Sequence, residues 1–135
     1  MKELIDAAIQ AREKAYVPYS KFKVGAAVLT KSGIIVSGCN VENASYGLSN
    51  CAERTAIFKA VSEGEQDFSV IAVAADTERP VAPCGACRQV LLEYQMLQKN
   101  QGIPIYMQGE GAEILSVSQV QDLLPFAFFE EKLNT

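Results

Sequence analysis

The sequence predicts an α/β fold, a three-layer α/β/α sandwich built on a five-stranded mixed sheet. Two observations lead to this prediction. A helical pattern and two strand-like runs come first, and strands then alternate with helices along the rest of the chain. In the middle, FSVIAVAA at residues 68–75 is a nearly continuous apolar run, as expected of a central strand covered on both faces.

The first elements follow from the spacing of apolar residues. Residues 2–16 place apolar side chains three and four positions apart, which predicts an amphipathic helix that ends before Pro18. Residues 23–30 and 34–40 are rich in strand-forming residues and are joined by Lys31-Ser32-Gly33. This pattern predicts a β-hairpin.

A polar segment without clear periodicity, residues 41–50, separates the hairpin from the next helix. Good helix formers return over residues 51–63. Asn50 or Ser49 is available as the N-cap of this helix, and Gly64 as its C-cap. The central strand over residues 68–75 follows.

The last third of the chain continues the alternation. A loop leads through Pro83 to a helix over residues 84–97, and residues 103–108 and 112–117 are predicted to be strands. A short helix over residues 118–124 precedes the C-terminal stretch. Since no repeat, low-complexity segment or linker interrupts this order, we expect residues 1–135 to form one compact domain.

Composition excludes several partners. The chain has 12 Lys and Arg against 16 Asp and Glu, a net charge of −4, and its basic residues are spread along the sequence. This distribution disfavours a nucleic-acid binder. No stretch approaches the ~20 apolar residues that a membrane span needs, and the N-terminus lacks the apolar core of a signal peptide. We therefore expect a cytoplasmic protein with no nucleic-acid and no membrane partner.

The absence of histidine restricts the chemistry most. It removes Ser-His and Cys-His catalytic pairs and every imidazole metal ligand. A transition-metal site must then use cysteine or carboxylate ligands. The four cysteines, in a chain without a secretion signal, are more typical of metal binding or catalysis than of disulfides.

Three cysteines have the spacing of a metal site. Cys84 and Cys87 lie in Pro83-Cys84-Gly85-Ala86-Cys87 at the start of one predicted helix, and Cys51 begins another, with Glu53 two residues on. Both helices follow strands, where the ligand crevice of an open α/β sheet forms. Three thiolates leave one position of a tetrahedral zinc free for water, which is typical of a catalytic site. Glu53 would carry protons beside it.

Alternative interpretations of these residues remain open. The three thiols also suit a structural zinc site, for which Cys39 is the remaining cysteine ligand, although its apolar strand favours a small core residue. Glu53 also suits a first-turn glutamate stabilised by the helix dipole.

The signature Cys51-Ala52-Glu53 with Pro83-Cys84-Gly85-Ala86-Cys87 resembles that of the zinc-dependent nucleoside and nucleobase deaminases. The resemblance extends over nearly the whole chain, through the segments at residues 22–27, 40–43, 51–56, 83–89 and 123–125. The chain is similar to the small homotetrameric cytidine deaminases whose zinc ligands are all cysteines. The implied fold is cytidine deaminase-like.

This resemblance implies hydrolytic deamination of cytidine and deoxycytidine to uridine and deoxyuridine in pyrimidine salvage, with one Zn²⁺ per subunit. A zinc-activated water attacks C4 of the pyrimidine, and Glu53 shuttles the protons. The resemblance also implies substrate-binding residues: the backbone at Ala52 for the pyrimidine edge, Asn40 and Glu42 for the ribose hydroxyls, and Phe22 for the pocket wall.

Aromatic residues near the C-terminus indicate a subunit interface. Residues 125–130 read PFAFFE, and little core remains in a monomer to cover three phenylalanines. In the family that the chain resembles, a C-terminal phenylalanine reaches into the neighbouring subunit's site. Phe128 is expected to do so, in preference to Phe126. Tyr46 is expected to contribute across the interface as well. The expected assembly is a homotetramer.

Arg54 is expected to adjust the charge at the metal. Zn²⁺ with three thiolates carries one excess negative charge, which makes it a weaker acidifier of water than zinc held by imidazoles. Arg54 follows Glu53 directly, so its guanidinium can donate hydrogen bonds to ligand sulfurs. The other interpretation is a surface arginine in a salt bridge.

Two other functions compete with nucleoside deamination. One is deamination of another cytosine-bearing small molecule, such as blasticidin S, by a similar all-cysteine enzyme. Asn40, Glu42 and the aromatic C-terminus favour a ribose-bearing substrate instead. The other is a non-catalytic structural zinc module used for assembly.

Overall fold

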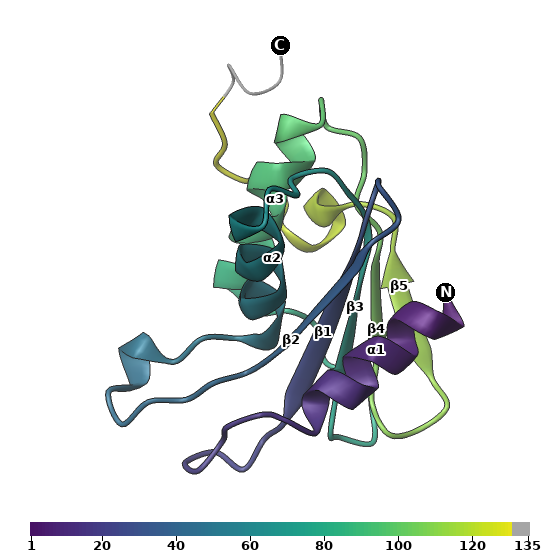
Figure 1. The fold of residues 1–135 in the computed structure, drawn as a ribbon. Coiled ribbons are helices and arrows are strands. Elements are labelled where there is room, and N and C mark those ends of the chain that lie inside the picture. The colour runs from purple at the N-terminus through teal and green to yellow at the C-terminus, as the bar shows by residue number, and fades with distance from the viewer. Residues whose placement is uncertain (131–135) are drawn as a thin grey trace.

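The computed structural model describes residues 1–130 and consists of a sheet with helices on both faces (Figure 1). Its elements, in chain order, are α1 (Lys2–Arg12), β1 (Val24–Thr30), β2 (Ile35–Cys39), the 3₁₀ turn η1 (Tyr46–Leu48), α2 (Ala52–Ser62), β3 (Phe68–Ala75), α3 (Gly85–Leu97), β4 (Ile105–Gln108), β5 (Ile114–Val117) and the 3₁₀ turn η2 (Val120–Leu123).

The sheet confirms the predicted mixed, five-stranded architecture. Its strand order is β2-β1-β3-β4-β5. β3 and β4 pair in parallel through the α3 crossover, and the other neighbours pair antiparallel. α1 packs on one face of the sheet, and α2 and α3 cover the other, which gives three layers.

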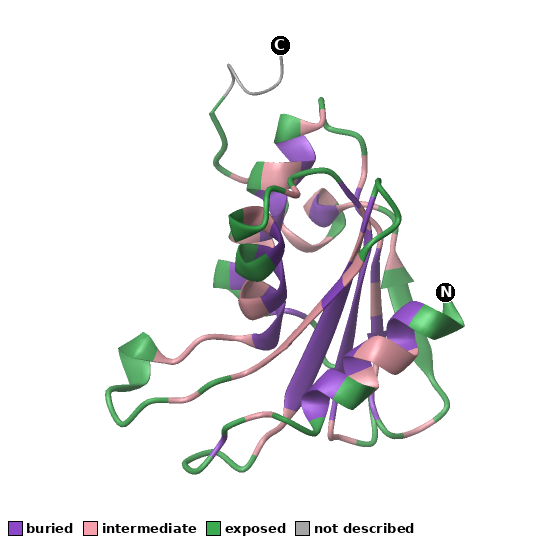
Figure 2. Ribbon diagram, in the orientation of Figure 1, coloured by how far each residue is buried: buried purple, intermediate pink, exposed green. Residues whose placement is uncertain are grey.

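Alternating side chains of β3 supply both core layers, as the strand period of two requires. Val70, Ala72 and Ala74 pack with Leu4 and Ala8 beneath α1. The intervening residues of β3 point to the opposite face. There Ile71 joins the core formed with α2 and α3, which includes Ile57, Leu91 and Leu92. Val73 and Ala75 pack beside the start of α2, against Ala52 and Ala56. Figure 2 shows the resulting buried centre of the sheet.

Helix α2 packs so closely on β2 that its backbone touches the strand. A Cβ added at Gly38 would lie 2.6 Å from the backbone nitrogen of Ala56 and 2.9 Å from Cγ2 of Thr55. A side chain at this position would therefore push α2 away from the sheet. The close approach fixes the N-terminal end of α2, which carries Cys51.

The predicted first helix is too long, because α1 ends at Arg12 rather than before Pro18. The backbone nitrogen of Tyr16 instead donates to the carbonyl of Asn40, and Tyr16 forms an isolated bridge with Val41. Pairing with the segment after β2 replaces the last helical turn.

The predicted caps of α2 are also partly wrong. Cys51 is its N-cap, in place of Asn50 or Ser49, and its side chain makes no capping hydrogen bond. Gly64 follows the C-cap residue, Glu63. Because this sulfur does not cap the backbone of its own helix, it is available to the side chains around it.

The later elements are shorter than predicted. β4 and β5 each begin two residues further along the chain than expected, and α3 begins at Gly85 with Cys84 as its N-cap. The last predicted helix, over residues 118–124, is the 3₁₀ turn η2.

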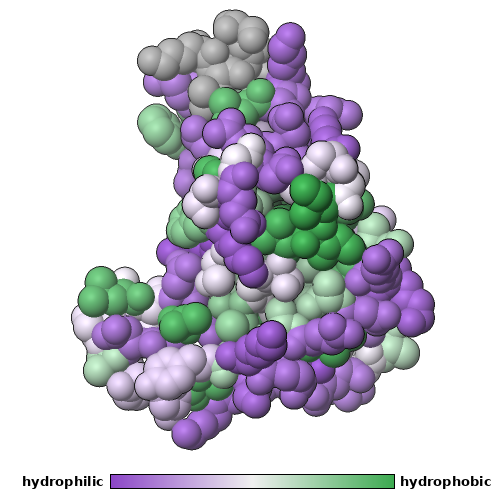
Figure 3. Space-filling view, in the orientation of Figure 1, coloured by the Kyte–Doolittle hydropathy of each residue, from purple (hydrophilic) through white to green (hydrophobic). Residues whose placement is uncertain are grey.

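Two loops project from the body of the molecule, residues 17–23 and the segment from Asn40 to Asn50 that carries η1 (Figure 1). Figure 3 shows hydrophobic side chains at the tip of the second loop. There Tyr46 is 75% exposed and Leu48 72%. Within residues 1–130, none of the helices combines the length and the apolar character required to cross a membrane.

Candidate active site

Three cysteines meet where the N-termini of two helices face each other. Cys51 is the N-cap of α2, Cys84 is the N-cap of α3, and Cys87 lies in the first turn of α3. Since helix N-termini carry partial positive charge, both helices favour negatively charged sulfur at this point. The structure thus brings together the three cysteines that the sequence predicted as ligands.

The distances between these sulfurs fit a zinc ion. The Sγ atoms of Cys51 and Cys84 are 3.6 Å apart, and those of Cys84 and Cys87 are 3.4 Å apart. All three lie within 4.8 Å of one another. Zn–S bonds of about 2.3 Å in a tetrahedron place sulfurs about 3.8 Å apart. The cluster therefore fits a three-cysteine zinc site with its fourth position free.

Electrostatic contacts favour the thiolate of Cys51. A hydrogen bond from Cys87, together with hydrogen bonds from Arg54 and Cys84, outweighs burial and lowers the pKa of Cys51 to about 5. The same hydrogen bond to Cys51, together with burial, raises the pKa of Cys87. Of these two sulfurs, that of Cys51 is therefore the more readily ionised.

Arg54 lies against the sulfurs, as the sequence predicted. Its Nη2 donates to Sγ of Cys51 at 3.3 Å, and its contacts with the sulfurs raise the pKa of the guanidinium. Its Nε is buried and has no hydrogen-bond partner within residues 1–130. A charged donor in this place offsets negative charge on the sulfurs.

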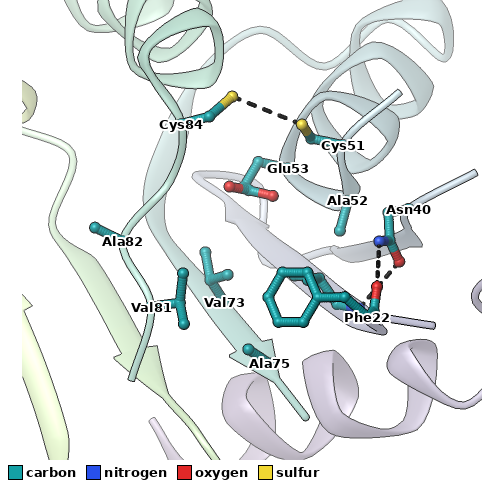
Figure 4. A pocket seen from close by; sticks show the side chains of 11 residues that line it. Phe22, Asn40, Cys51, Ala52, Glu53, Val73, Ala75, Val81, Ala82 and Cys84 are labelled. Atoms are coloured by element: carbon teal, nitrogen blue, oxygen red, sulfur yellow. Dashed lines mark hydrogen bonds between the residues drawn. The ribbon is translucent and has the colours of Figure 1, made fainter. Parts of the chain in front are cut away.

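Glu53 is buried beside the cluster and is 4% exposed. Burial, and the negative charge of Cys51, raise its pKa to about 7. A carboxyl that exchanges its proton near neutral pH is suited to general acid–base work. Figure 4 shows its carboxyl group beside the sulfurs of Cys51 and Cys84, on the side of the cavity.

A cavity of about 210 Å³ opens next to Glu53 and the sulfurs. Phe22 and Ala52, both predicted from the sequence, line it, as Figure 4 shows. Five further lining residues were not predicted: Val24 at the start of β1, Val73 and Ala75 at the end of β3, and Val81 and Ala82 in the loop before Pro83. The apolar lining is suited to the faces of a flat ring.

The wall formed by Val81 and Ala82 belongs to a loop that the turn after β4 holds in place. The backbone nitrogen of Glu110 donates to the carbonyl of Thr77 at 2.6 Å, and that of Gly111 donates to the carbonyl of Glu78 at 3.0 Å. A Cβ at Gly109 would lie 2.3 Å from the Thr77 carbonyl oxygen. Close contact between two backbones therefore sets the position of this wall.

Asn40 lies at the edge of the cavity and braces Phe22. Its Nδ2 donates to the carbonyl of Phe22 at 2.8 Å, and its Oδ1 accepts from the backbone nitrogen of Val24 at 3.0 Å (Figure 4). A side-chain amide has two N–H groups and two lone pairs. One of each therefore remains for a ligand.

Glu42 lies outside this cavity. It lines a neighbouring hollow with Tyr19, Ser20 and Tyr46. Its Oε1 accepts from the backbone nitrogens of Tyr19 and Ser20 at 3.1 Å, and its Oε2 accepts from the hydroxyl of Ser20. These bonds, led by the Ser20 hydroxyl, lower the pKa of Glu42.

The remaining predicted residues lie away from the cavity of the same chain. Phe128 is 82% exposed in the C-terminal segment. Tyr46 lies on the projecting loop, and its ring packs edge-on against Tyr19. Cys39 is half-buried at the end of β2, where it lines a separate hollow with Lys14 and Lys59 rather than the core.

Comparison with known proteins identifies the same region. Residues 1–100 match the family model of the cytidine and deoxycytidylate deaminase zinc-binding region. The chain is 56% identical to a cytidine deaminase of Halalkalibacterium halodurans over 97% of this chain and 96% of the relative. A crystal structure of cytidine deaminase from Burkholderia pseudomallei superposes with a TM-score of 0.87 at 50% identity, covering 94% of this chain and 98% of the other.

A relative with another substrate in its name is more distant. A blasticidin-S deaminase of Bacillus cereus is 35% identical over 68% of this chain and 71% of its own length. The similarity to cytidine deaminases is both higher and more complete.

Proposed function

Because the chain belongs to the family of cytidine and deoxycytidylate deaminases with a zinc-binding region, we propose that it hydrolyses cytidine and deoxycytidine to uridine and deoxyuridine, releasing ammonia. Zinc is the cofactor, and the three-cysteine cluster fits it. We assign Cys51, Cys84 and Cys87 as its ligands, with one ion per subunit. This activity belongs to pyrimidine salvage.

One observation carries the proposal. A buried carboxyl group, that of Glu53, lies between a cluster of three sulfurs and an apolar cavity that contains no other carboxyl group among its lining residues. A structural zinc site has no use for a buried acid aimed into a cavity, and burial makes such an acid costly. A hydrolytic site needs it.

Glu53 performs the proton transfers in this proposal. Bound Zn²⁺ supplies Lewis acidity, which makes a water molecule nucleophilic at neutral pH. Glu53 accepts a proton from that water as its oxygen bonds to C4 of the cytosine ring. It delivers this proton to N3, then takes the second proton from the hydroxyl now on C4 and gives it to the departing amino group, so that ammonia leaves and the C4 carbonyl forms. The raised pKa of Glu53, about 7, suits a group that both takes and gives protons.

The cavity walls orient the base. Phe22 and Val73 offer apolar surface to a flat ring, and the buried backbone at Ala52 lies at the start of α2, where its polar groups serve the pyrimidine edge. A fixed ring keeps C4 beside the sulfur cluster. This orientation reduces the entropic part of the barrier.

Asn40 and Glu42 are proposed to bind the ribose. Asn40 retains one N–H and one lone pair, as its hydrogen bonds leave them. Glu42 lies in the adjacent hollow and keeps acceptor capacity while it holds the loop at Tyr19 and Ser20. A sugar that extends from the cavity toward this hollow meets both residues.

The active assembly is proposed to be a homotetramer with shared active sites. The exposed aromatic and apolar residues of the projecting loop and of the C-terminal segment support this, because monomeric proteins rarely leave such groups uncovered. Tyr46 and Phe128 are among them. In the tetramer, Phe128 rather than Phe126 is proposed to close the neighbouring subunit's cavity.

A cytoplasmic location suits the chemistry of the site. Free thiols and thiolate ligands persist in reducing compartments, whereas oxidising compartments convert neighbouring cysteines to disulfides. The four cysteines of this chain are free.

The direct test is to incubate the zinc-loaded protein with cytidine and to follow the loss of cytosine absorbance and the release of ammonia. Deoxycytidine is run in parallel. Turnover of both, abolished by stripping the zinc and restored by adding it back, supports the proposal. Absence of turnover with stoichiometric zinc supports the structural zinc module instead.

Blasticidin S provides the second arm of this test. Asn40 at the rim of the cavity and Glu42 in the next hollow favour a ribose-bearing substrate. A specificity constant for blasticidin S above that for cytidine would contradict the proposed substrate while leaving the reaction type intact.

A further inference from the structure

Arg88, the residue after Cys87, joins two parts of the chain that are far apart in sequence. Its Nε donates to the carbonyl of Pro83 at 2.7 Å, and its Nη1 donates to the carbonyl of Leu123 at 2.7 Å. The side chain is half-buried. One guanidinium therefore holds two backbone carbonyl groups at once.

The first of these carbonyls belongs to the peptide that presents a proposed ligand. Pro83 is buried and immediately precedes Cys84, which has the extended backbone of an N-cap (φ −66°, ψ 166°). Rotation of the peptide between Pro83 and Cys84 would turn the cysteine relative to the other two sulfurs. Within residues 1–130, the hydrogen bond from Arg88 is the one that holds the Pro83 carbonyl.

The second carbonyl lies where the C-terminal segment leaves the body. Leu123 ends η2, and residues 124–130 follow without regular structure. Leu124 and Ala127 pack against the core, whereas Phe128 is exposed. The hydrogen bond to the Leu123 carbonyl therefore sets the point and direction from which the aromatic segment departs.

The neighbouring residue holds the same segment further along. Nε2 of Gln89 donates to the carbonyl of Phe128 at 2.8 Å. Gln89 makes no such contact with the loop before Cys84 in the described part of the chain. The two adjacent side chains of α3 thus differ: Gln89 contacts only the C-terminal segment, whereas Arg88 contacts both that segment and the loop at Pro83.

We propose that Arg88 is a positioning residue that couples the ligand loop at Pro83–Cys84 to the C-terminal aromatic segment, so that the metal site and the segment assigned to the neighbouring cavity are ordered together. The inference rests on the proposed ligand set. Arginine suits this role because its planar fork offers donors in fixed directions, whereas a lysine ammonium acts as a single point.

The test measures metal retention and segment order separately. Zinc release to a chromogenic chelator reports the ligand loop, and the absorption spectrum of the Co²⁺-substituted protein reports the arrangement of the sulfurs. Hydrogen–deuterium exchange of peptides from residues 120–130 reports the segment. Four zinc-loaded variants are compared with the parent: Arg88→Met, Arg88→Lys, Gln89→Ala and Arg79→Met.

Arg88→Met is expected to release zinc at least about ten-fold faster, the size usual for loss of a residue that orients ligands, and to exchange faster over residues 120–130. Gln89→Ala should speed exchange alone. Arg79→Met is the matched control, since Arg79 is an exposed arginine paired with Glu113 at 3.6 Å, and both measurements should stay unchanged.

Three outcomes would overturn the inference. Arg88→Met with parental zinc release refutes the role at the ligand loop, and parental exchange refutes the coupling. If Arg88→Met does not fold, Arg88→Lys decides, because parental values in both measurements would show that the fork is unnecessary. Failure of the parent protein to bind zinc would instead remove the proposed ligand set, so the two failures are distinguishable.

Discussion

Replacing Glu53 by Gln tests the proton-transfer role directly. The amide has nearly the shape of the carboxyl but cannot accept and return a proton. Glu53 is the one carboxyl group among the described residues that line the cavity, so no other acid or base is in place to substitute. The apolar walls also limit rescue by solvent.

The size of the loss follows from this isolation. General acid–base catalysis contributes about 10²- to 10⁴-fold, which corresponds to about 2.7–5.4 kcal/mol of barrier. We expect Glu53→Gln to lose that much of kcat. The zinc content should stay equal to that of the parent protein, because the three sulfurs are untouched.

The assay follows the loss of cytidine absorbance, with zinc measured by elemental analysis and folding by thermal unfolding. Glu63→Gln is the matched control, since Glu63 is an exposed glutamate at the other end of α2. Activity above about a tenth of the parent value, with full zinc content, would show that Glu53 is not the proton carrier.

Four further predictions concern other parts of the molecule. Cys84→Ala should lose zinc and thermal stability together, while Cys39→Ser keeps both, and equal zinc content in the two variants, measured by elemental analysis, would remove Cys84 from the ligand set. Truncation after Pro125 should reduce both association and activity, as sedimentation and turnover measurements would detect, and a fully active monomer would refute shared sites. Arg54→Gln should keep the fold but weaken zinc affinity by about ten-fold, because the contact with the Cys51 sulfur is lost; chelator titration against the parent protein measures this. Hydrogen bonds lower the folded-state pKa of Glu42, so the stability that its carboxylate contributes is present above the usual pKa of 4.5 and is lost as the pH falls through the folded-state pKa. Unfolding curves of Glu42→Gln and of the parent protein should therefore differ at pH 6 and converge in stronger acid.

The fold was predictable where hydrophobic pattern alone decides the structure. The strand at residues 68–75 has the predicted bounds, because both of its faces are buried and the apolar run is continuous. The first helix was predicted too long, because the spacing continues to Tyr16 while pairing with the segment after β2 stops the helix at Arg12. Tertiary pairing of this kind leaves no local signal.

The candidate site, like the fold, could be predicted from the sequence only in part. The cysteines and Glu53 were identifiable because their spacing is itself the signal. Val81 and Ala82 were missed, since a loop residue reveals nothing in sequence about which cavity it lines. Glu42 was grouped with Asn40 because the family resemblance implies ribose contacts for both, whereas the structure places Glu42 in the neighbouring hollow, bound to the loop at Tyr19 and Ser20.

The backbone contact at Gly109 has a consequence for how substrate range can change. The turn after β4 holds this loop at the carbonyls of Thr77 and Glu78, and Arg88 holds it at the carbonyl of Pro83. Because none of these contacts uses the side chains of Val81 and Ala82, those two residues can vary while the wall stays where it is. The surface offered to a substrate is thereby separable from the metal site and from folding. Natural divergence, or a designed library at these two positions, can reshape the cavity in small steps without first rebuilding the loop.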